Sequence, residues 1–361
     1  MNKNSKKICK KGVWNNSIYN INFDNEGISN YYYMFNKLEN AFPNNTEGEK
    51  IWNKILKTIS MNNNKYDCIV GLSGGTDSSY LLHLAVKKWK LKPLAVYLDN
   101  GWSTEIAVSN IKKMTDSLNV DLETYVINYE EVKAVLTSFM KAQLPWIDSP
   151  TDFAIKSILY KLAAKEKIKT ILVGTDFRSE GKQPEEWTHI DYKLFKYVVK
   201  KYSNIKLKTF PQMSIAKQLY YNAILKIQRY QPFYFLNYNK KDAQNILINN
   251  YDWKYYGGHH HENLFTKFAI SFWMYKKFNI DKRIITLSAQ VVSKQINRGA
   301  ALESLKNAPY DVDTIDADIQ VVLKKLGMSS SEFKKIWDKK NKSFKDYPSY
   351  YYLFIKNKKI I

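Results

Sequence analysis

Apolar residues in the first half of the chain form short continuous runs separated by segments with helical spacing. Four runs predict buried strands, at residues 66–72, 93–98, 122–127 and 170–173. The segments around them repeat apolar residues every three to four positions, which predicts helices over residues 48–60, 78–88, 104–118, 129–141 and 152–165. Strands separated by helices of this length predict a parallel sheet covered by helices on both faces.

Beyond residue 174 the alternation of strands and helices ends, and the chain becomes aromatic, basic and helical. Helices are predicted over residues 191–202, 213–229, 240–249, 264–278, 288–297, 313–326 and 330–339. We therefore expect an α/β fold with a doubly wound, mainly parallel sheet. Its predicted parts are a small irregular N-terminal segment (1–45), an α/β domain (46–230) and a helical, substrate-binding C-terminal region (231–361).

Composition narrows the class of protein. The 361 residues carry a formal net charge of +22. They are 45% hydrophobic, and this fraction is too high for a disordered chain. No run approaches the roughly 18 apolar residues that span a bilayer, and the basic N-terminus has no apolar stretch after it, so we expect a cytoplasmic protein. The positive charge predicts acidic partners, namely nucleotides, nucleic acid or an anionic membrane face, without choosing among them.

The stretch after the first predicted strand is rich in glycine and hydroxyl groups. It consists of Ser73, Gly74, Gly75, Thr76, Asp77 and Ser78, and it leads directly into a predicted helix. Adjacent glycines let the backbone turn tightly and bring several N–H groups onto one point, where the helix N-terminus adds partial positive charge. The pattern predicts a phosphate loop, but neither a Walker A loop nor a GxGxxG fingerprint. The alternative is a glycine-rich turn with a helix cap.

The Ser-Gly-Gly-x-Asp-Ser motif resembles the pyrophosphate loop of the ATP-pyrophosphatase superfamily, which includes NAD synthetase and tRNA thiolation and lysidine enzymes. The resemblance implies an adenine nucleotide alpha hydrolase-like fold and binding of ATP by residues 73–78. It also implies cleavage of ATP between the α and β phosphates, with adenylation of a substrate carbonyl oxygen. Ser73 and Asp77 are then the expected catalytic residues of the loop, and Asp77 is also expected to hold Mg²⁺.

Further candidates follow the other strands, because ligands of doubly wound sheets bind beyond the carboxyl ends of the strands. Asp99 and Gly174 end the second and fourth predicted strands and are expected to contact the nucleotide. Asp176 is a candidate second Mg²⁺ ligand, and its alternative is a helix-cap or turn residue. Trp102 is expected to flank a base or sugar, and its alternative is a core position.

Three later stretches resemble the N-acetyl sugar amidotransferases, bacterial enzymes of surface polysaccharide and nonulosonic acid synthesis. They lie at residues 174–191, 207–211 and 256–302, and the resemblance covers roughly residues 65–335. It implies an enzyme that converts the acetamido group of a nucleotide-activated N-acetyl sugar to an acetamidino group. ATP would adenylate the acetamido oxygen, and ammonia would then displace AMP.

The stretches that carry this resemblance, together with Trp102 after the second predicted strand, supply the candidate substrate-binding residues. These are Trp102, Glu180, Gly181, Trp187, His260, Glu262, Lys267, Arg283 and Arg298. The three cations would hold phosphates or a carboxylate, and the alternative for each is a solvated surface charge. The histidine and Glu262 would bind sugar hydroxyls or move a proton in a catalytic role. Three consecutive histidines at 259–261 do not predict a metal site, because they cannot all face one ion in regular structure.

The N-terminal segment departs from its relatives, which open with two Cys-x-x-Cys pairs that read as a small zinc ribbon. Here Cys9 stands at the first ligand position, and Gly12, Ser29 and Tyr32 stand at the other three. We therefore expect a degenerate ribbon-like segment that binds no zinc.

The source of ammonia is predicted by elimination. Neither Cys9, in the degenerate ribbon, nor Cys68, inside the first strand, is placed as a glutaminase nucleophile, so a separate glutaminase subunit or free ammonia is expected. We expect no nucleic acid partner and no stable membrane insertion. Two alternatives remain open: a tRNA-modifying enzyme of the lysidine type, and a non-catalytic nucleotide-binding subunit of a polysaccharide pathway.

Overall fold

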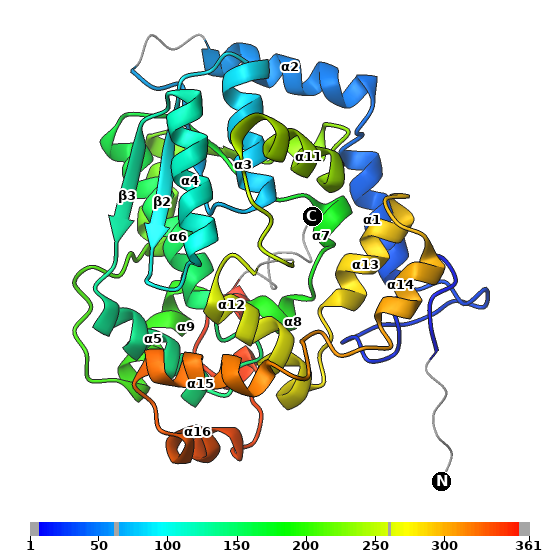
Figure 1. Ribbon diagram of the computed structural model, residues 1–361, viewed down its shortest axis with the longest axis vertical. Helices are drawn as coiled ribbons and strands as arrows, with labels where there is room; N and C mark the ends of the chain where they lie inside the picture. The colour runs from blue at the N-terminus through cyan, green and yellow to red at the C-terminus, as the bar shows by residue number, and fades with distance from the viewer. Residues whose placement is uncertain (1–6, 61–64, 259–260, 354–361) are drawn as a thin grey trace.

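The sheet of the protein is parallel throughout. The computed structural model describes residues 7–60, 65–258 and 261–353. Within them the strands lie in the order β3-β2-β1-β4-β5. Their bounds are β1 (Cys68–Gly71), β2 (Pro93–Asp99), β3 (Leu122–Val126), β4 (Thr170–Leu172) and β5 (Gln228–Tyr230). The α/β fold class with a parallel, doubly wound sheet is confirmed, and Figure 1 shows the sheet at one side of the molecule.

Strand order places a switch point between β1 and β4. The chain runs from β1 to β2 to β3 in one direction, and β4 then lies on the other side of β1. Connections on the two sides of this point leave on opposite faces of the sheet, which opens a crevice beyond the carboxyl ends of the strands. The loop at residues 73–75 follows β1, so it lies at this crevice.

Helices cover both faces of the sheet. The helices of this half are α2 (Thr46–Ser60), α3 (Thr76–His83), η1 (Leu84–Lys88), α4 (Glu105–Leu118), α5 (Tyr129–Lys141) and α6 (Ser149–Lys165). Alternate residues of β1 point to opposite faces. Val70 lies in a core cluster with residues of α2, α3 and α4, whereas Ile69 lies in a cluster with residues of α6.

The C-terminal half is helical, as predicted. Its elements are α7 (Phe177–Glu180), α8 (Glu185–Thr188), α9 (Tyr192–Tyr202), α10 (Ile215–Leu219), η2 (Tyr220–Ile224), η3 (Pro232–Tyr234), α11 (Lys240–Tyr251), α12 (Leu264–Phe268), η4 (Ala269–Lys277), α13 (Arg283–Val292), α14 (Arg298–Ser304), α15 (Ile315–Leu326), α16 (Ser330–Trp337) and η5 (Phe344–Asp346). One core cluster joins residues of the N-terminal segment, of α5 and α6, and of the C-terminal helices. The three predicted parts share this core, and the boundaries between them stay a prediction. No helix in the described ranges is long and apolar enough to cross a bilayer.

Three element predictions are wrong in part. The segment predicted to be irregular contains α1 (Asn30–Ala41), which Ser29 caps by accepting a hydrogen bond from the Tyr32 amide. The helix predicted over 213–229 ends at Ile224, and the chain then forms β5, because β4 offers an open edge to pair with. The helix predicted over 288–297 begins earlier, at Arg283, and ends at Val292.

The motif at residues 207–211 has a structural partner. The buried carboxylate of Glu131 accepts hydrogen bonds from the backbone N–H groups of Lys208, Thr209 and Phe210 at 2.7–3.1 Å. Burial raises the pKa of Glu131, but these amides outweigh burial and hold its pKa below the ordinary value. Glu131 therefore fastens the 207–211 loop to α5.

Replacing Glu131 by alanine is expected to lower the free energy of unfolding by about 2–4 kcal/mol, because three backbone donors lose their acceptor in a buried place. Urea unfolding followed by circular dichroism measures the effect. Glu130→Ala is the matched control: Glu130 lies next in sequence, is exposed and forms a surface ion pair with Lys133, so the loss is expected within about 0.5 kcal/mol. Equal losses in the two variants would contradict the structural role of Glu131.

Candidate functional site

The loop after β1 is tightly fixed. Gly74 has a φ of +78°, and a Cβ atom there would lie 2.2 Å from the carbonyl oxygen of Ala107 on α4, so glycine alone fits. The Gly74 carbonyl accepts hydrogen bonds from Trp253 Nε1 at 3.2 Å and from Asn110 Nδ2 at 3.3 Å. The loop is thus held by α4 and by the segment that follows α11.

Hydroxyl groups organise the loop from within. Ser78 Oγ accepts a hydrogen bond from the Ser73 amide at 3.1 Å, and Ser73 Oγ accepts one from the Gly75 amide at 3.3 Å. Thr76 begins α3, and its amide donates to Tyr256 Oη at 3.2 Å. Glycine N–H groups, hydroxyls and a helix N-terminus converge here, which is the donor set that binds phosphate oxygens. The residues present therefore fit the predicted phosphate loop.

Asp77 is held by two residues that sequence reasoning missed. Lys240 Nζ lies 2.9 Å from Asp77 Oδ2, and the Tyr238 hydroxyl donates to Asp77 Oδ1. The side chains of Lys240 and Asp77 are only 21% and 17% exposed. Burial lowers the pKa of Lys240, but the Asp77 carboxylate and its neighbours outweigh burial and raise it. Burial and the same carboxylate raise the pKa of Tyr238, so Tyr238 stays a hydrogen-bond donor.

The sequence did contain a signal for Lys240. It is the first residue of α11, and a cation in the first turn of a helix is disfavoured by the helix dipole. A lysine at that position therefore predicts a nearby carboxylate that compensates its charge. The neighbouring residues in the sequence do not show that this carboxylate is Asp77.

The end of β4 lies against the start of α3. A Cβ atom at Gly174 would lie 2.8 Å from the carbonyl carbon and oxygen of Asp77, so the missing side chain allows this approach. Asp176 follows it, is 1% exposed and caps α7, because Oδ1 accepts from the Arg178 amide and Oδ2 from the Ser179 amide. The cap is thus present, and the predicted Mg²⁺ role of Asp176 stays a prediction.

Burial raises the pKa of Asp176 to about 6, although the amides of α7 lower it. The native state therefore binds a proton more tightly than the unfolded state between about pH 4 and pH 6, and stability falls as the pH rises through this window. As the pH rises from about 4 to about 6, we expect the free energy of unfolding of wild type to fall by about 3 kcal/mol relative to that of Asp176→Asn. Urea unfolding of both proteins across pH 3.5–7 measures the difference, and a constant difference would contradict it.

Glu262 and Tyr256 lie at the mouth of the loop. A Cβ atom on Gly75 would lie 3.2 Å from Glu262 Oε1 and 3.1 Å from Tyr256 Oη. The Glu262 carbonyl accepts a hydrogen bond from the Thr104 amide, which ties this segment to the turn after β2. The structure thus brings Glu262 to the phosphate loop. His260, its predicted companion, lies outside the described residues.

A second charged cluster adjoins the loop. Lys282 precedes α13, and its ammonium group lies 4.7 Å from the ring centre of Trp146. Burial lowers the pKa of Lys282, and the carboxylates of Asp152, Glu180 and Asp148 oppose this effect. The Glu180 carboxylate also raises the pKa of Lys240, so its charge acts on both lysines. The cluster therefore extends the site from the phosphate loop toward the N-terminus of α6.

Both aspartates of this cluster are fixed in place. Trp146 Nε1 donates to Asp152 Oδ2 at 2.7 Å, and the Thr266 hydroxyl donates to Asp148 Oδ2. Helix α6 precedes β4 and runs antiparallel to it, which sets the first turn of α6 at the carboxyl edge of the sheet. Of this cluster, Glu180 was predicted as a substrate residue, but the grouping was not, because its members come from three separate segments.

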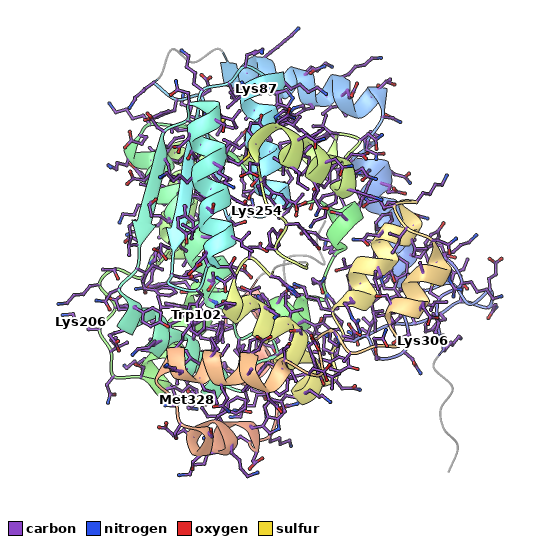
Figure 2. The ribbon with its side chains drawn as sticks, in the orientation of Figure 1. Lys87, Trp102, Lys206, Lys254, Lys306 and Met328 are labelled. Atoms are coloured by element: carbon purple, nitrogen blue, oxygen red, sulfur yellow. The ribbon has the colours of Figure 1, made fainter. Side chains whose placement is uncertain are left out.

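Two predicted substrate residues are core residues. Trp102 is 0% exposed, and its ring lies 5.2 Å from that of Phe265, which is the alternative that the sequence left open. Trp187 is 5% exposed in the largest core cluster. Figure 2 labels the position of Trp102.

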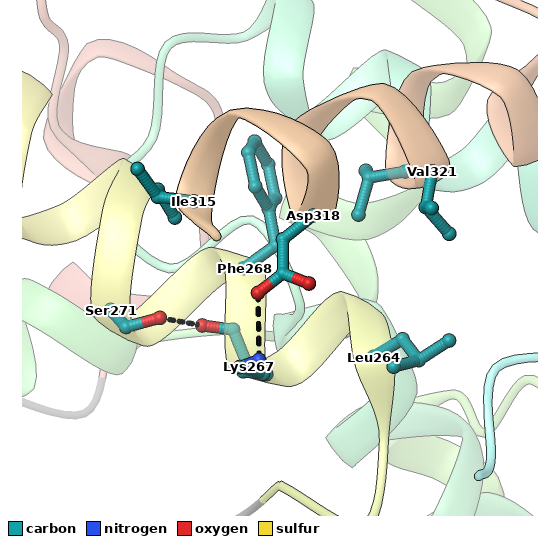
Figure 3. Close-up of a pocket in the computed structure, with 8 residues that line it drawn as sticks. Leu264, Lys267, Phe268, Ser271, Ile315, Asp318 and Val321 are labelled. Atoms are coloured by element: carbon teal, nitrogen blue, oxygen red, sulfur yellow. Dashed lines mark hydrogen bonds and ion pairs between the residues drawn. The ribbon is translucent and has the colours of Figure 1, made fainter. Parts of the chain in front are cut away.

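The three predicted substrate cations are each engaged elsewhere. Lys267 pairs with Asp318 at 2.7 Å beside a small cavity of about 20 Å³ between α12 and α15, as Figure 3 shows. Arg283 pairs with Asp281 at 2.8 Å and donates to the carbonyls of Ser304, which ends α14, and of Asn307. Arg298 donates to the carbonyls of Cys9 and Gly12 at 3.0 and 2.9 Å, so it holds the N-terminal segment. These contacts are structural, and a substrate role for the three residues stays a prediction.

The remaining predicted residues border the site. Asp99 ends β2, and its Oδ1 accepts a hydrogen bond from the Gly101 amide at 2.9 Å. Gly181 has a φ of +70°, and a Cβ atom on it would lie 2.6 Å from Ile285 Cγ2, so it permits the contact between α7 and α13. That contact sets the position of Glu180, whose carbonyl accepts from Thr286 Oγ1.

Hydrogen bonds around Cys9 hold the N-terminal segment in place. Cys9 Sγ accepts a hydrogen bond from the Ser29 amide at 3.3 Å, and the Cys9 amide donates to the Trp14 carbonyl. Among the described residues, no group of three or more His, Cys, Asp or Glu side chains is placed to hold a metal. The absence of zinc stays a prediction.

Comparison with known families covers both halves of the chain. A family model described as NAD synthase matches residues 49–182, which include the phosphate loop, Gly174 and Asp176. A second model, described as LPS biosynthesis protein WbpG-like, C-terminal domain, matches residues 262–359. The chain is an ATP-pyrophosphatase superfamily protein with a WbpG-like C-terminal domain. The resemblance inferred from the sequence motifs is confirmed at this level. In this ATP-pyrophosphatase protein, the paired residues Asp77 and Lys240 come from α3 and α11.

Individual proteins are similar to this chain at lower levels of identity or over shorter segments. An uncharacterized protein of Methanocaldococcus jannaschii is 38% identical over 80 residues, which cover 22% of this chain and 29% of that protein. The NMN synthetase of Francisella tularensis aligns with a TM-score of 0.30 at 15% identity, over 64% of this chain and 93% of that one. The NH3-dependent NAD synthetase of Campylobacter jejuni aligns with a TM-score of 0.31 at 15% identity, over 73% and 96%.

Proposed function

We propose that this protein is an ATP-dependent amidotransferase that converts the acetamido group of a nucleotide-activated N-acetyl sugar into an acetamidino group. The observation that supports it most is the phosphate loop with Asp77 paired to Lys240, next to the cluster around Lys282. The WbpG-like C-terminal match supports a role in lipopolysaccharide synthesis. The NAD synthase match supports an ATP-using reaction.

The proposed chemistry has two steps. The acetamido oxygen attacks the α-phosphorus of ATP, and pyrophosphate leaves as an adenylated imidate forms. Ammonia then adds to the imidate carbon, and AMP leaves with the oxygen. Pyrophosphate is a dispersed negative charge, so donors fixed in advance stabilise its departure better than an acid or base.

The residues have distinct proposed roles. The amides of Gly74 and Gly75 and the hydroxyls of Ser73 and Ser78 bind the β and γ phosphates. Lys240 stabilises the charge that develops on them. Asp77 would hold Mg²⁺, which supplies further neutralisation when bound.

The cluster at the N-terminus of α6 is the proposed sugar subsite. Carboxylates at Asp148, Asp152 and Glu180 accept hydrogen bonds from sugar hydroxyls, and they would repel a phosphate. Lys282 is a donor in the same place. The proposed sugar subsite therefore consists of this cluster and does not include Lys267, Arg283 and Arg298. Those three side chains form ion pairs or hydrogen bonds with other parts of the protein.

Release of pyrophosphate from ATP tests the proposal. The purified protein, ATP, Mg²⁺ and ammonium chloride are incubated with a panel of nucleotide-linked N-acetyl sugars, and in parallel with tRNA. We expect pyrophosphate and AMP only with one of the sugars, and a product one mass unit lighter than that sugar. Pyrophosphate release that depends on tRNA would indicate the lysidine-type alternative. If neither the sugars nor tRNA led to any release, a non-catalytic subunit would be favoured.

The nitrogen source gives a separate prediction. Ammonium salts are expected to support turnover that rises with pH, because free NH₃ is the nucleophile, whereas glutamine alone is expected to support none. Cys9 and Cys68 are both buried, so neither thiol is accessible to glutamine, and burial also raises the pKa of the Cys68 thiol. Turnover is measured as AMP release with each nitrogen source. If the protein used glutamine, and this activity disappeared in Cys9→Ala or Cys68→Ala, the prediction would be contradicted. The proposed source of ammonia is a separate glutaminase subunit.

A further inference from the structure

One stretch of the chain is free of acidic residues. Between Asp191 and Asp242 there is no Asp or Glu, although the average of 34 carboxylates in 361 residues would place about five there. The stretch carries ten lysines and one arginine: Lys193, Lys196, Lys200, Lys201, Lys206, Lys208, Lys217, Lys226, Arg229, Lys240 and Lys241. It therefore holds half of the formal net charge of +22. All of these cations are exposed except Lys240, which faces the phosphate loop, and Figure 2 shows Lys206 projecting from the edge of the molecule.

The same stretch exposes large apolar side chains. Leu219 is 61% exposed, Tyr220 50% and Ile224 67%, and no residue of α10 or η2 is buried. In a π-helix, backbone hydrogen bonds join residues five positions apart, so Leu219 and Ile224 lie close together along one side of the helix. This forms a small apolar ridge, defined here as Leu219, Tyr220 and Ile224.

The opposite side of this helix anchors it to the body. The ring of Tyr221 stacks on that of Tyr160 with centres 6.0 Å apart. Lys156 Nζ, also on α6, donates to Gln218 Oε1 at 3.2 Å. The helix is thus fixed on α6, and the apolar ridge faces solvent between the exposed cations Lys217 and Lys226.

We propose that the apolar ridge and the cations around it dock the protein on an anionic lipid surface. Leu219 and Ile224 enter the interface, Tyr220 lies at the headgroup level, and Lys217 and Lys226 contact acidic headgroups. The absence of carboxylates over the whole stretch removes the repulsion that such a surface would otherwise meet.

Lipid is favoured over RNA as the partner because of the aliphatic residues. Basic surfaces bind both, but Leu219 and Ile224 gain nothing from a sugar-phosphate backbone, whereas they leave water in an acyl layer. The inference does not rest on the proposed function, because it concerns a surface formed by α10 and η2 and not the phosphate loop.

Sedimentation with vesicles tests the inference on the full chain. Phosphatidylcholine vesicles with and without phosphatidylglycerol are compared at low and high salt. We expect binding only to the anionic vesicles, weakened by salt. Leu219→Ser/Ile224→Ser and Lys217→Gln/Lys226→Gln are each expected to weaken it about tenfold or more. All four positions are exposed, so the fold is expected to survive.

Matched controls lie elsewhere on the surface. Val312→Ser/Ile248→Ser removes two exposed aliphatic groups, and Lys339→Gln/Lys340→Gln removes two exposed charges, and neither is expected to change binding. Insertion is followed with an environment-sensitive dye on Ile224→Cys, since Cys9 and Cys68 are buried. Its emission is expected to shift to the blue on anionic vesicles.

Four results would overturn the inference. They are no binding to anionic vesicles, equal binding by the ridge variant and wild type, an unshifted dye, and a ridge variant that instead loses self-association or tRNA binding. The last result would assign the surface to a second copy of the chain or to RNA.

Discussion

Replacing Asp77 by asparagine is expected to reduce pyrophosphate release from ATP by about 1000-fold while the protein stays folded. Asparagine keeps the volume of the side chain and an oxygen for the Tyr238 hydroxyl, but it removes the charge that pairs with Lys240. It also removes the carboxylate proposed to hold Mg²⁺. The measurement is the initial rate of pyrophosphate release at saturating ATP and Mg²⁺, with thermal unfolding as the check on folding.

The control for Asp77 is Asp242→Asn, which changes an exposed carboxylate in the first turn of α11. It is expected to retain the wild-type rate. Titration with Mg²⁺ adds a second readout, because loss of a Mg²⁺ ligand raises the Mg²⁺ concentration needed for half-maximal rate. A wild-type rate in Asp77→Asn would contradict the role of Asp77 in the reaction.

Replacing Lys240 by methionine is expected to lower kcat about 100-fold and to raise the KM for ATP about tenfold. The methionine keeps the length of the side chain but loses the ammonium group that pairs with Asp77 Oδ2, and with it a cation at the phosphate loop. Steady-state kinetics with ATP as the varied substrate measure both effects. Lys241→Met is the matched control, since Lys241 is the next residue of the same helix and is exposed.

The double variant Asp77→Ala/Lys240→Met separates two roles of Lys240. If Lys240 only neutralises Asp77, the double variant has the rate of Asp77→Ala alone. If it also contacts the departing phosphates, the double variant is slower again. Indistinguishable kinetics of Lys240→Met and Lys241→Met would contradict any role in the site.

The strands and the phosphate loop could be predicted because their signals are local. Val70 and its neighbours form an apolar run, Gly74 and Gly75 follow at once, and α3 begins at Thr76, so strand, turn and helix are continuous in sequence. The same reasoning found Asp99 at the end of β2 and Gly174 after β4. Strand β5 was missed because its three residues have no apolar run and depend on the open edge of β4.

Whether a charged or aromatic residue serves the site was decided by contacts far apart in sequence. The sequence identified Arg298 and Trp102 as residues suited to binding, but Arg298 holds the carbonyls of Cys9 and Gly12, and Trp102 packs in the core. Their chemistry is the same in either place. Only the fold determines whether a guanidinium meets a ligand or a backbone carbonyl.

By itself the sequence determined the α/β class, the phosphate loop and the position of Asp77 within it. The tertiary structure decided that Lys240 pairs with Asp77, 163 residues away in the sequence. It also decided that three carboxylates act on Lys282. The physical reason is the range of the forces involved. Backbone conformation and the hydrophobic period are set by near neighbours, whereas an ion pair in a cleft forms only after distant elements have packed and excluded water around it.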